Sequence, residues 1–216
     1  MTAVFLDLDG TLMESHTSIL TSLQHAFRAI ERDDLAASDL MWMIGPPFQD
    51  SFAKLGLAGS DVDTVLETYR FHYQGGEMFN ATPYDGVMEA LVQMRADGAR
   101  LYLMTAKPHV YATKITAHFG IADHMTQEFG PETDGTHNWK GDLLAHALTV
   151  TGEKAAHSVM VGDRHHDTAA AAEVGMPFLA AEWGYGSQEE WKGARAVLAR
   201  PHDLPQAVRS LNLGAR

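Results

Sequence analysis

Short apolar runs, separated by stretches with helical periodicity, are the dominant pattern of this sequence. Apolar runs bounded by turn signals are typical of buried strands, and the intervening stretches have the length of helices. The runs are residues 3–8, 99–104, 158–161 and 177–180, and the stretches between or after them are 87–96, 110–119, 141–149 and 167–174. This alternation predicts an α/β fold with a parallel sheet.

A long, mainly helical segment interrupts the alternation after the first strand. Apolar residues recur at helical spacing from Ser18 to about Arg32, and a second helix is predicted over 61–73 with Ser60 as its N-cap. Between these helices the segment 44–47 breaks the chain. The sequence therefore predicts a catalytic core formed by residues 1–14 and 83–216, with a helical domain inserted at 15–82.

Composition and charge restrict the partners of the protein. The 216 residues include 28 acidic and 16 basic side chains, which gives a net charge of −12. Such a surface repels nucleic acid, although a small anion can still bind where a metal ion and a few cations reverse the potential locally. We expect no nucleic-acid partner, whereas a small anionic ligand remains compatible with this charge.

The chain has no cysteine, which excludes disulfides, thiolate metal sites and a cysteine nucleophile. Its first residues lack the pattern of a signal peptide, and no apolar run approaches the ~18 residues of a membrane span. The expectation is a cytoplasmic protein without a membrane partner, as a monomer or homodimer.

Two acidic residues close the first strand. Asp7 and Asp9 lie two positions apart, so their side chains point the same way at the carboxyl end of that strand, where ligands of open parallel sheets bind. Gly10 and Thr11 follow and supply backbone N–H groups to an anion-binding turn. The alternative is that the acids merely form a turn, since Asp-Gly is a common turn pair.

A second acidic cluster follows another predicted strand. Asp163 and Asp167 come directly after the run 158–161, in the same position as the first pair. Four carboxylates from two strand ends are the oxygen ligands that Mg²⁺ prefers. Alternatively, Asp167 is an acid that stabilises a helix N-terminus. A metal site at the adjacent His165 and His166 is disfavoured, because neighbouring loop residues seldom bind one ion together.

Three further polar residues have positions suited to phosphate. Thr105 ends the run 99–104 before a predicted helix, where a hydroxyl binds phosphate or caps the helix. Lys140 begins a helix, which is mildly costly for a cation unless an anion is near. Lys107 is a competing phosphate ligand, or alternatively a solvated or cap-facing cation.

In order along the chain, these segments resemble the four motifs of the haloacid dehalogenase superfamily. They are DLDGTL at 7–12, Thr105, Lys140 and GDRHHD at 162–167. The resemblance spans most of the chain and implies a Rossmann-like core with an inserted helical cap domain.

Within the superfamily the chain looks like the phosphoglycolate phosphatase group. Three segments carry that likeness, IGPP at 44–47, YDGV at 84–87 and TAKP at 105–108. Bacterial 5′-nucleotidases share the cap pattern.

Carried over position by position, the resemblance assigns roles to the acids. It implies that Asp7 is the nucleophile and a metal ligand. Asp9 would be the general acid/base and would also offer its backbone carbonyl to Mg²⁺. Asp163 would bind the metal directly, and Asp167 would do so through water or would orient Lys140.

The resemblance also implies a set of phosphate contacts. Thr105 and Lys140 would hold the transferring phosphoryl group, and Gly10 and Ala106 would donate backbone N–H groups to it. Lys107 remains a further candidate for binding the substrate.

The implied reaction is Mg²⁺-dependent hydrolysis of a small phosphate monoester through an aspartyl phosphate, with 2-phosphoglycolate as the first candidate. A 5′-nucleotidase and a sugar phosphomutase are the enzymatic alternatives. A phospho-accepting or metal-binding module without activity would have no use for Asp9 as a proton donor. A dehalogenase needs neither that acid for its halide leaving group nor magnesium.

Overall fold

The computed structural model describes residues 2–46, 48–211 and 213. The chain divides into two compact units: residues up to 14 together with those from 83 onward form one, and residues 15–82 form the other. The first is called the core unit here and the second the insert. Pro47, the last residue of the IGPP segment, lies outside the described residues.

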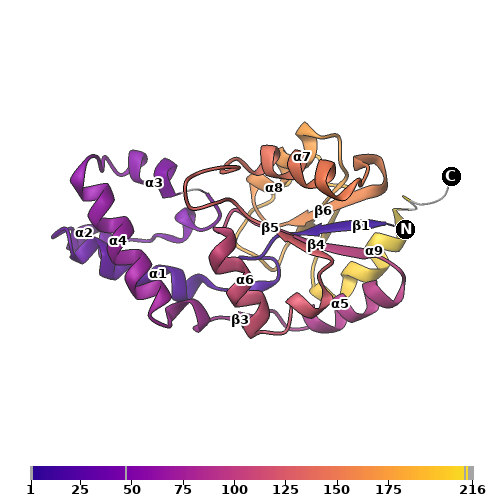
Figure 1. Ribbon diagram of the computed structural model, residues 1–216, viewed down its shortest axis with the longest axis horizontal. Coiled ribbons are helices and arrows are strands. Elements are labelled where there is room, and N and C mark those ends of the chain that lie inside the picture. Colours follow the sequence, from indigo (N-terminus) through magenta and orange to yellow (C-terminus); the bar gives the residue numbers. More distant parts are fainter. Residues whose placement is uncertain (1, 47, 212, 214–216) are drawn as a thin grey trace. The chain divides into compact units, whose positions relative to one another are not determined.

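A six-stranded parallel sheet is the centre of the core unit (Figure 1). Its strands are β1 (Ala3–Leu6), β4 (Arg100–Met104), β5 (Gln127–Phe129), β6 (Ser158–Gly162), β7 (Phe178–Ala181) and β8 (Ala196–Leu198). The spatial order is β5-β4-β1-β6-β7-β8, and each neighbouring pair is parallel. From β1 the chain adds β4 and then β5 on one side of the sheet, and it then adds β6, β7 and β8 on the other side of β1. This reversal makes the edge beside β1 and β6 a topological switch point.

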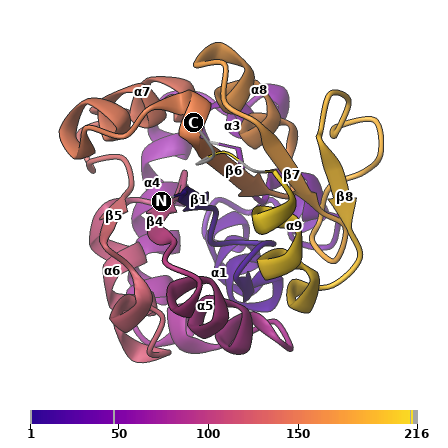
Figure 2. The same cartoon turned by 90° about the vertical axis from the view of Figure 1, so that its right-hand side faces the viewer.

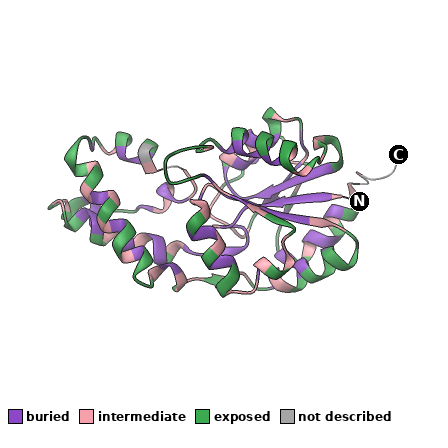
Figure 3. Ribbon diagram, in the orientation of Figure 1, coloured by how far each residue is buried: buried purple, intermediate pink, exposed green. Residues whose placement is uncertain are grey.

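The central strands are apolar because helices cover both of their faces. All four residues of β1 are fully buried, and Figure 3 shows the same burial along its neighbours. On one face Phe5 stacks on Tyr102 with ring centroids 4.8 Å apart. These two rings belong to a cluster that also takes side chains from the two helices packed on that face.

The helices of the core unit form two layers around the sheet. They are α5 (Val87–Ala96), α6 (His109–His118), α7 (Lys140–Thr151), α8 (His165–Glu173) and α9 (Leu204–Ser210). Figure 2 shows α7 and α8 together on one face and α5 and α9 on the opposite face. The predicted α/β class with a parallel sheet is therefore confirmed.

The insert is helical. Its α-helices are α1 (His16–Arg28), α2 (Asp33–Ala36), α3 (Phe48–Lys54) and α4 (Ser60–Gln74). The long helices α1 and α4 pack on each other through buried apolar residues such as Phe27 and Val65. A two-stranded sheet of β2 (Met13–Glu14) and β3 (Thr82–Pro83) marks where the chain leaves the core unit and returns to it.

The prediction that Ser60 is the N-cap of α4 is wrong. Ser60 is the first helical residue, and the preceding Gly59 has φ +58°, a conformation that glycine adopts without strain. Among the elements of the core unit that were also not predicted are the edge strands β5 and β8 and the helix α9. Both strands have only three residues and include exposed positions, so they lack the apolar run of a central strand.

None of the described helices has the length and apolar character needed to cross a membrane.

The burial difference between central and edge strands predicts a difference in stability. Val159 of β6 is fully buried, whereas Val197 of β8 is 48% exposed. Val159→Ala should lower the free energy of unfolding by roughly 2–3 kcal/mol, because two buried methyl groups are lost and a cavity remains. The same change at Val197 should cost less than about 1 kcal/mol. Urea denaturation of both variants measures this, and equal losses would contradict the assigned core.

Candidate active site

The carboxyl ends of β1, β4 and β6 carry most of the residues singled out from the sequence. Asp7 follows β1, and its backbone N–H donates to the carbonyl of Val161 at 3.0 Å, so the pairing with β6 continues past the strand end. Asp163 follows β6 and Thr105 follows β4. Parallel strands end on the same side of a sheet, so residues far apart in the chain meet here. We call this side of the sheet the carboxyl edge.

Three buried carboxylates converge at the carboxyl edge. One carboxylate oxygen from each of Asp7, Asp163 and Asp167 lies within 4.8 Å of the others. Asp7 is 5% exposed, and the other two are fully buried. Asp167 reaches this position from the first turn of α8, where it also accepts the backbone N–H of Arg164 at 3.0 Å. It therefore caps its helix and faces the other two acids.

Lys140 lies among these acids. It is the first residue of α7, and its Nζ is 2.7 Å from Asp7 Oδ1 and 2.5 Å from Asp167 Oδ1. Burial by itself would lower the pKa of Lys140, but the negative charges of Asp167 and Asp7 outweigh burial and raise this pKa above its ordinary value. The ammonium group therefore stays charged, and the two carboxylates offset the cost of a cation at a helix N-terminus.

Burial has the opposite effect on the acids. It raises the pKa of Asp7 from 3.8 to about 7, although the nearby Lys140 acts against this rise. Burial also raises the pKa of Asp163 well above its ordinary value, and the charges of Asp167 and Asp7 add to the effect. One lysine is thus insufficient to stabilise all of these carboxylates in their ionised form.

Asp9 has a cationic partner of its own. Lys107 Nζ lies 3.1 Å from Asp9 Oδ2, and the lysine side chain is 6% exposed against 13% for the aspartate. The interpretation of Lys107 as a solvated cation is therefore wrong. The lysine is buried because it neutralises Asp9 at the carboxyl edge.

Thr105 is buried and does not cap a helix. Its hydroxyl accepts the backbone N–H of Lys107 at 3.1 Å, and its own N–H donates to the carbonyl of Phe129. The following helix begins only at His109, which excludes the N-cap alternative. Ala106 lies between these residues and is partly buried.

The backbone N–H of Gly10 has a different role from the one implied by the family resemblance. It donates to the carbonyl of Met13 at 2.9 Å and is therefore engaged within the turn, so its predicted donation to a phosphoryl group is not supported. The residue has φ +84°, and a Cβ atom here would collide with the carboxylate of Asp163. Glycine is needed at this position so that the turn can approach Asp163 closely.

The histidines after Asp163 do not join the acids. Neither His165 nor His166 belongs to the group of possible metal ligands found among the described residues. His165 Nδ1 lies 3.1 Å from Glu190, outside that group.

Residues that the sequence interpretation missed lie between β7 and β8. The backbone N–H of Tyr185 donates to Asp163 Oδ2 at 2.7 Å, and the indole of Trp191 donates to the Asp163 carbonyl at 2.5 Å. The indole of Trp183 donates to the carbonyl of Thr11 at 2.9 Å. A signal was present, because alternating glycine and aromatic residues at 183–186 follow β7 at the same carboxyl edge.

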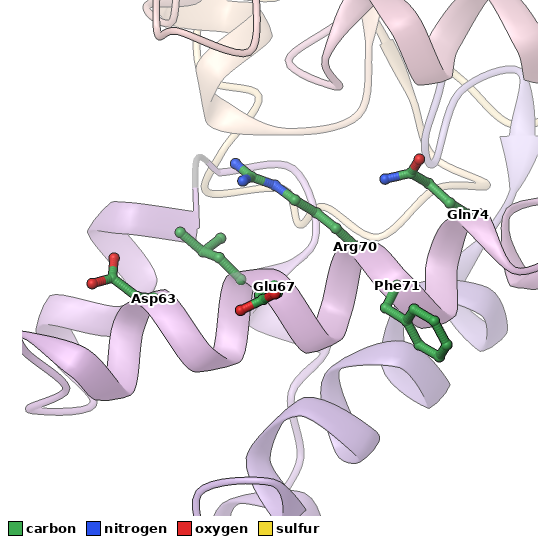
Figure 4. Close-up of a pocket in the computed structure, with 6 residues that line it drawn as sticks. Asp63, Glu67, Arg70, Phe71 and Gln74 are labelled. Carbon is green, nitrogen blue, oxygen red and sulfur yellow. The ribbon is translucent and has the colours of Figure 1, made fainter.

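The insert carries a separate open pocket of about 490 Å³ along α4. Arg70 and Gln74 project to one side of this helix and Phe71 to another (Figure 4). Its lining comes only from α4 and consists of Asp63, Leu66, Glu67, Arg70, Phe71 and Gln74. None of the site residues predicted from the sequence lines this pocket.

Comparison with known proteins identifies related sequences. Tyrosine-protein kinase PtkA of Mycobacterium tuberculosis is 36% identical over 85% of this chain, but the match covers only 62% of PtkA. A 5′-nucleotidase of Pseudomonas aeruginosa is 32% identical, with 87% of this chain and 85% of that protein covered. A phosphoglycolate phosphatase of Rhodospirillum rubrum is 30% identical, with 86% and 81% covered.

A solved structure agrees with the fold of this chain. The crystal structure of a predicted phosphatase from Clostridium acetobutylicum superposes with a TM-score of 0.89 at 27% identity, covering 97% of this chain and 98% of that one. The family model for haloacid dehalogenase-like hydrolases matches residues 4–181, which include all of the converging acids and Lys140. The chain therefore belongs to the haloacid dehalogenase-like hydrolase family.

Proposed function

We propose that this protein is a Mg²⁺-dependent phosphatase that hydrolyses a small phosphate monoester through an aspartyl phosphate on Asp7. The observation that carries the proposal is the convergence of Asp7, Asp163 and Asp167 around Lys140 at the carboxyl edge. Membership of the hydrolase family and the phosphatases among its relatives support the same reaction.

The charge balance of the site fits a divalent cation. Four carboxylates, those of Asp7, Asp9, Asp163 and Asp167, share the site with the ammonium groups of Lys107 and Lys140. Two negative charges remain, and a buried charge needs a partner. Carboxylate oxygens are the preferred ligands of Mg²⁺.

Asp7 and Asp163 are the proposed direct ligands of Mg²⁺, with the backbone carbonyl of Asp9 as a third. Asp167 would act through water or through its 2.5 Å ion pair with Lys140. When bound, Mg²⁺ supplies positive charge that stabilises the oxygens of the transferring phosphoryl group. Phosphoryl transfer depends mainly on such positioning and charge stabilisation.

Asp7 is the proposed nucleophile. Its carboxylate attacks phosphorus in line, the bond from phosphorus to the ester oxygen breaks, and an aspartyl phosphate forms. Lys140, 2.7 Å from Asp7 Oδ1, orients the carboxylate and favours its ionised form, which partly offsets the effect of burial. The same ammonium group and the Thr105 hydroxyl would hold the phosphoryl oxygens, with the N–H of Ala106 as a further donor.

Asp9 is the proposed general acid and base. It gives a proton to the departing alkoxide and then takes one from the water that hydrolyses the aspartyl phosphate. Lys107, which pairs with Asp9 at 3.1 Å, is proposed to hold that carboxyl group in place before substrate binds and to contact the substrate afterwards.

The candidate substrates differ in their leaving group. We take 2-phosphoglycolate as the first candidate, in keeping with the relative from Rhodospirillum rubrum. A nucleoside 5′-monophosphate is the second candidate, because the 5′-nucleotidase of Pseudomonas aeruginosa matches nearly the full length of both chains. Both substrates need the same chemistry at Asp7 and differ only in the group that departs.

A screen of phosphate esters with Mg²⁺ tests the proposed reaction. The wild-type chain should release inorganic phosphate from 2-phosphoglycolate or from a nucleoside 5′-monophosphate. Asp7→Asn should show no turnover, because the amide cannot form the acyl phosphate. Asp123→Asn, a change at a residue outside the site, is the control and should keep wild-type turnover. Wild-type-like turnover in Asp7→Asn would remove the nucleophile assignment, and isomerisation of a sugar phosphate without phosphate release would indicate a mutase.

Magnesium should stabilise the folded protein as well as activate it. A ligand that binds only the folded state raises the melting temperature with its concentration. We expect Mg²⁺ to raise the Tm of the EDTA-treated wild-type protein and to raise that of Asp163→Asn much less. Differential scanning calorimetry measures both shifts. An unchanged wild-type Tm at millimolar Mg²⁺, or full activity in EDTA, would count against the metal role.

The raised pKa of Asp7 predicts how the metal-free protein responds to pH. Because its pKa is about 7 when folded against 3.8 ordinarily, the folded state retains a proton that the unfolded state has lost between these values. Stability therefore falls as pH rises through this window. Asn at position 7 cannot ionise, so the stability of Asp7→Asn relative to wild type should increase from about pH 4 to about pH 7 and then level off. Urea denaturation in EDTA tests this, and a pH-independent difference would contradict it.

A further inference from the structure

Residues 182–195, between β7 and β8, hydrogen-bond to Asp163, which together with Asp7 and Asp167 forms what we call the acid cluster. The Tyr185 N–H donates to Asp163 Oδ2 at 2.7 Å, and the Trp191 indole donates to the Asp163 carbonyl at 2.5 Å. The Thr11 hydroxyl donates to Asp163 Oδ1 at 3.3 Å. Both carboxylate oxygens and the backbone carbonyl of one residue are thus fixed by three separate donors.

This segment, called the clamp segment here, packs very closely against two acidic turns, the one after β1 that contains Gly10 and the one after β6 that contains Asp163. A Cβ atom at Gly186 would collide with the Asp163 carbonyl, and one at Gly184 would collide with the carbonyl of Gly10. The two glycines therefore permit an approach that other residues would prevent. The closeness indicates that the clamp segment helps to fix the acidic turns.

Glu190, the neighbour of Trp191, anchors the clamp segment to the start of α8. Its carboxylate accepts from Arg164 Nε at 2.9 Å and from the backbone N–H of His165 at 3.0 Å. Its backbone carbonyl accepts the hydroxyl of Thr168 at 2.9 Å. These bonds fix the backbone immediately before Trp191.

Trp191 itself is held by packing. It is 5% exposed and belongs to the apolar cluster beneath α7 and α8, so its ring has little freedom. A buried N–H that lost its acceptor would cost stability, which favours keeping the bond to Asp163. Because packing fixes the ring, its hydrogen bond to the Asp163 carbonyl also fixes the backbone at residue 163 relative to the apolar cluster.

We propose that Trp191 is a positioning residue, whose indole N–H fixes the backbone of Asp163 so that the carboxylate keeps one orientation toward the divalent cation. This inference rests on the proposed function, since it requires a cation at the acid cluster. An ionised carboxylate has about four lone-pair sites, and Thr11 and Tyr185 occupy one on each oxygen. The remaining sites are available to the metal only while the carboxylate keeps this orientation.

The test compares Mg²⁺ affinity in two variants that each lose one donor from the same apolar cluster. Trp191→Phe removes the indole N–H beside Asp163. Tyr102→Phe removes a hydroxyl that donates to Glu153 at 2.7 Å, away from the acids. Partners that orient metal ligands typically contribute 10–100-fold to metal affinity, so Trp191→Phe should bind Mg²⁺ about 10–100-fold more weakly than wild type. Tyr102→Phe should bind it with wild-type affinity.

Isothermal titration calorimetry of the full, EDTA-treated chain measures these affinities without any substrate. Wild-type affinity in Trp191→Phe, or equal weakening in both variants, would overturn the positioning role. If Trp191→Phe does not fold by circular dichroism, Thr168→Val replaces it, because this change releases the Glu190 carbonyl next to Trp191. That variant should bind Mg²⁺ more weakly than Tyr102→Phe, and equal affinities would again contradict the inference.

The two levels of the proposal fail in different ways. A wild-type chain that binds no Mg²⁺ would overturn the metal role and, with it, the role of Trp191. A wild-type chain that binds Mg²⁺ while Trp191→Phe binds it equally well would overturn only the positioning role and leave the phosphatase proposal intact.

Discussion

An excess of buried negative charge at the carboxyl edge is the constraint on which the rest of the site depends. Asp7, Asp163 and Asp167 are brought within 4.8 Å of one another by the ends of two central strands and the start of one helix. Lys140 offsets part of this charge, but burial still raises the pKa of Asp7, and the charge of Asp167 adds to the rise. The fold tolerates this cost because the sheet and the packed helices around it supply enough apolar burial to hold the charges together.

Much of this arrangement follows from the sequence because parallel strands impose it. A buried strand that ends in acids must present them at the carboxyl edge, so the runs before Asp7 and Asp163 were sufficient to predict that these residues meet. The long apolar runs likewise predicted the central strands. Short edge strands such as β5 carry too few apolar residues for the same inference, and their place is decided by pairing with a neighbour already in the sheet.

Contacts between distant segments explain what the sequence did not predict. Whether Lys107 was solvated or buried depended on Asp9, nearly a hundred positions earlier, which local pattern does not reveal. The family resemblance implied that the Gly10 N–H donates to a phosphoryl group, but within the turn this N–H donates to the carbonyl of Met13. The sequence around Trp191 does not indicate a functional role, because its only link to the site is the hydrogen bond that its indole N–H donates to the carbonyl of the distant Asp163.

The central claim is that the acids of the carboxyl edge share one divalent cation. Crystals grown with Mn²⁺ in place of Mg²⁺ test it most directly, because anomalous scattering locates the ion without reference to activity. The account predicts one strong peak, about 2.0–2.3 Å from carboxylate oxygens of both Asp7 and Asp163. A protein saturated with Mn²⁺ whose peak lies elsewhere, or touches only one of these residues, would contradict it.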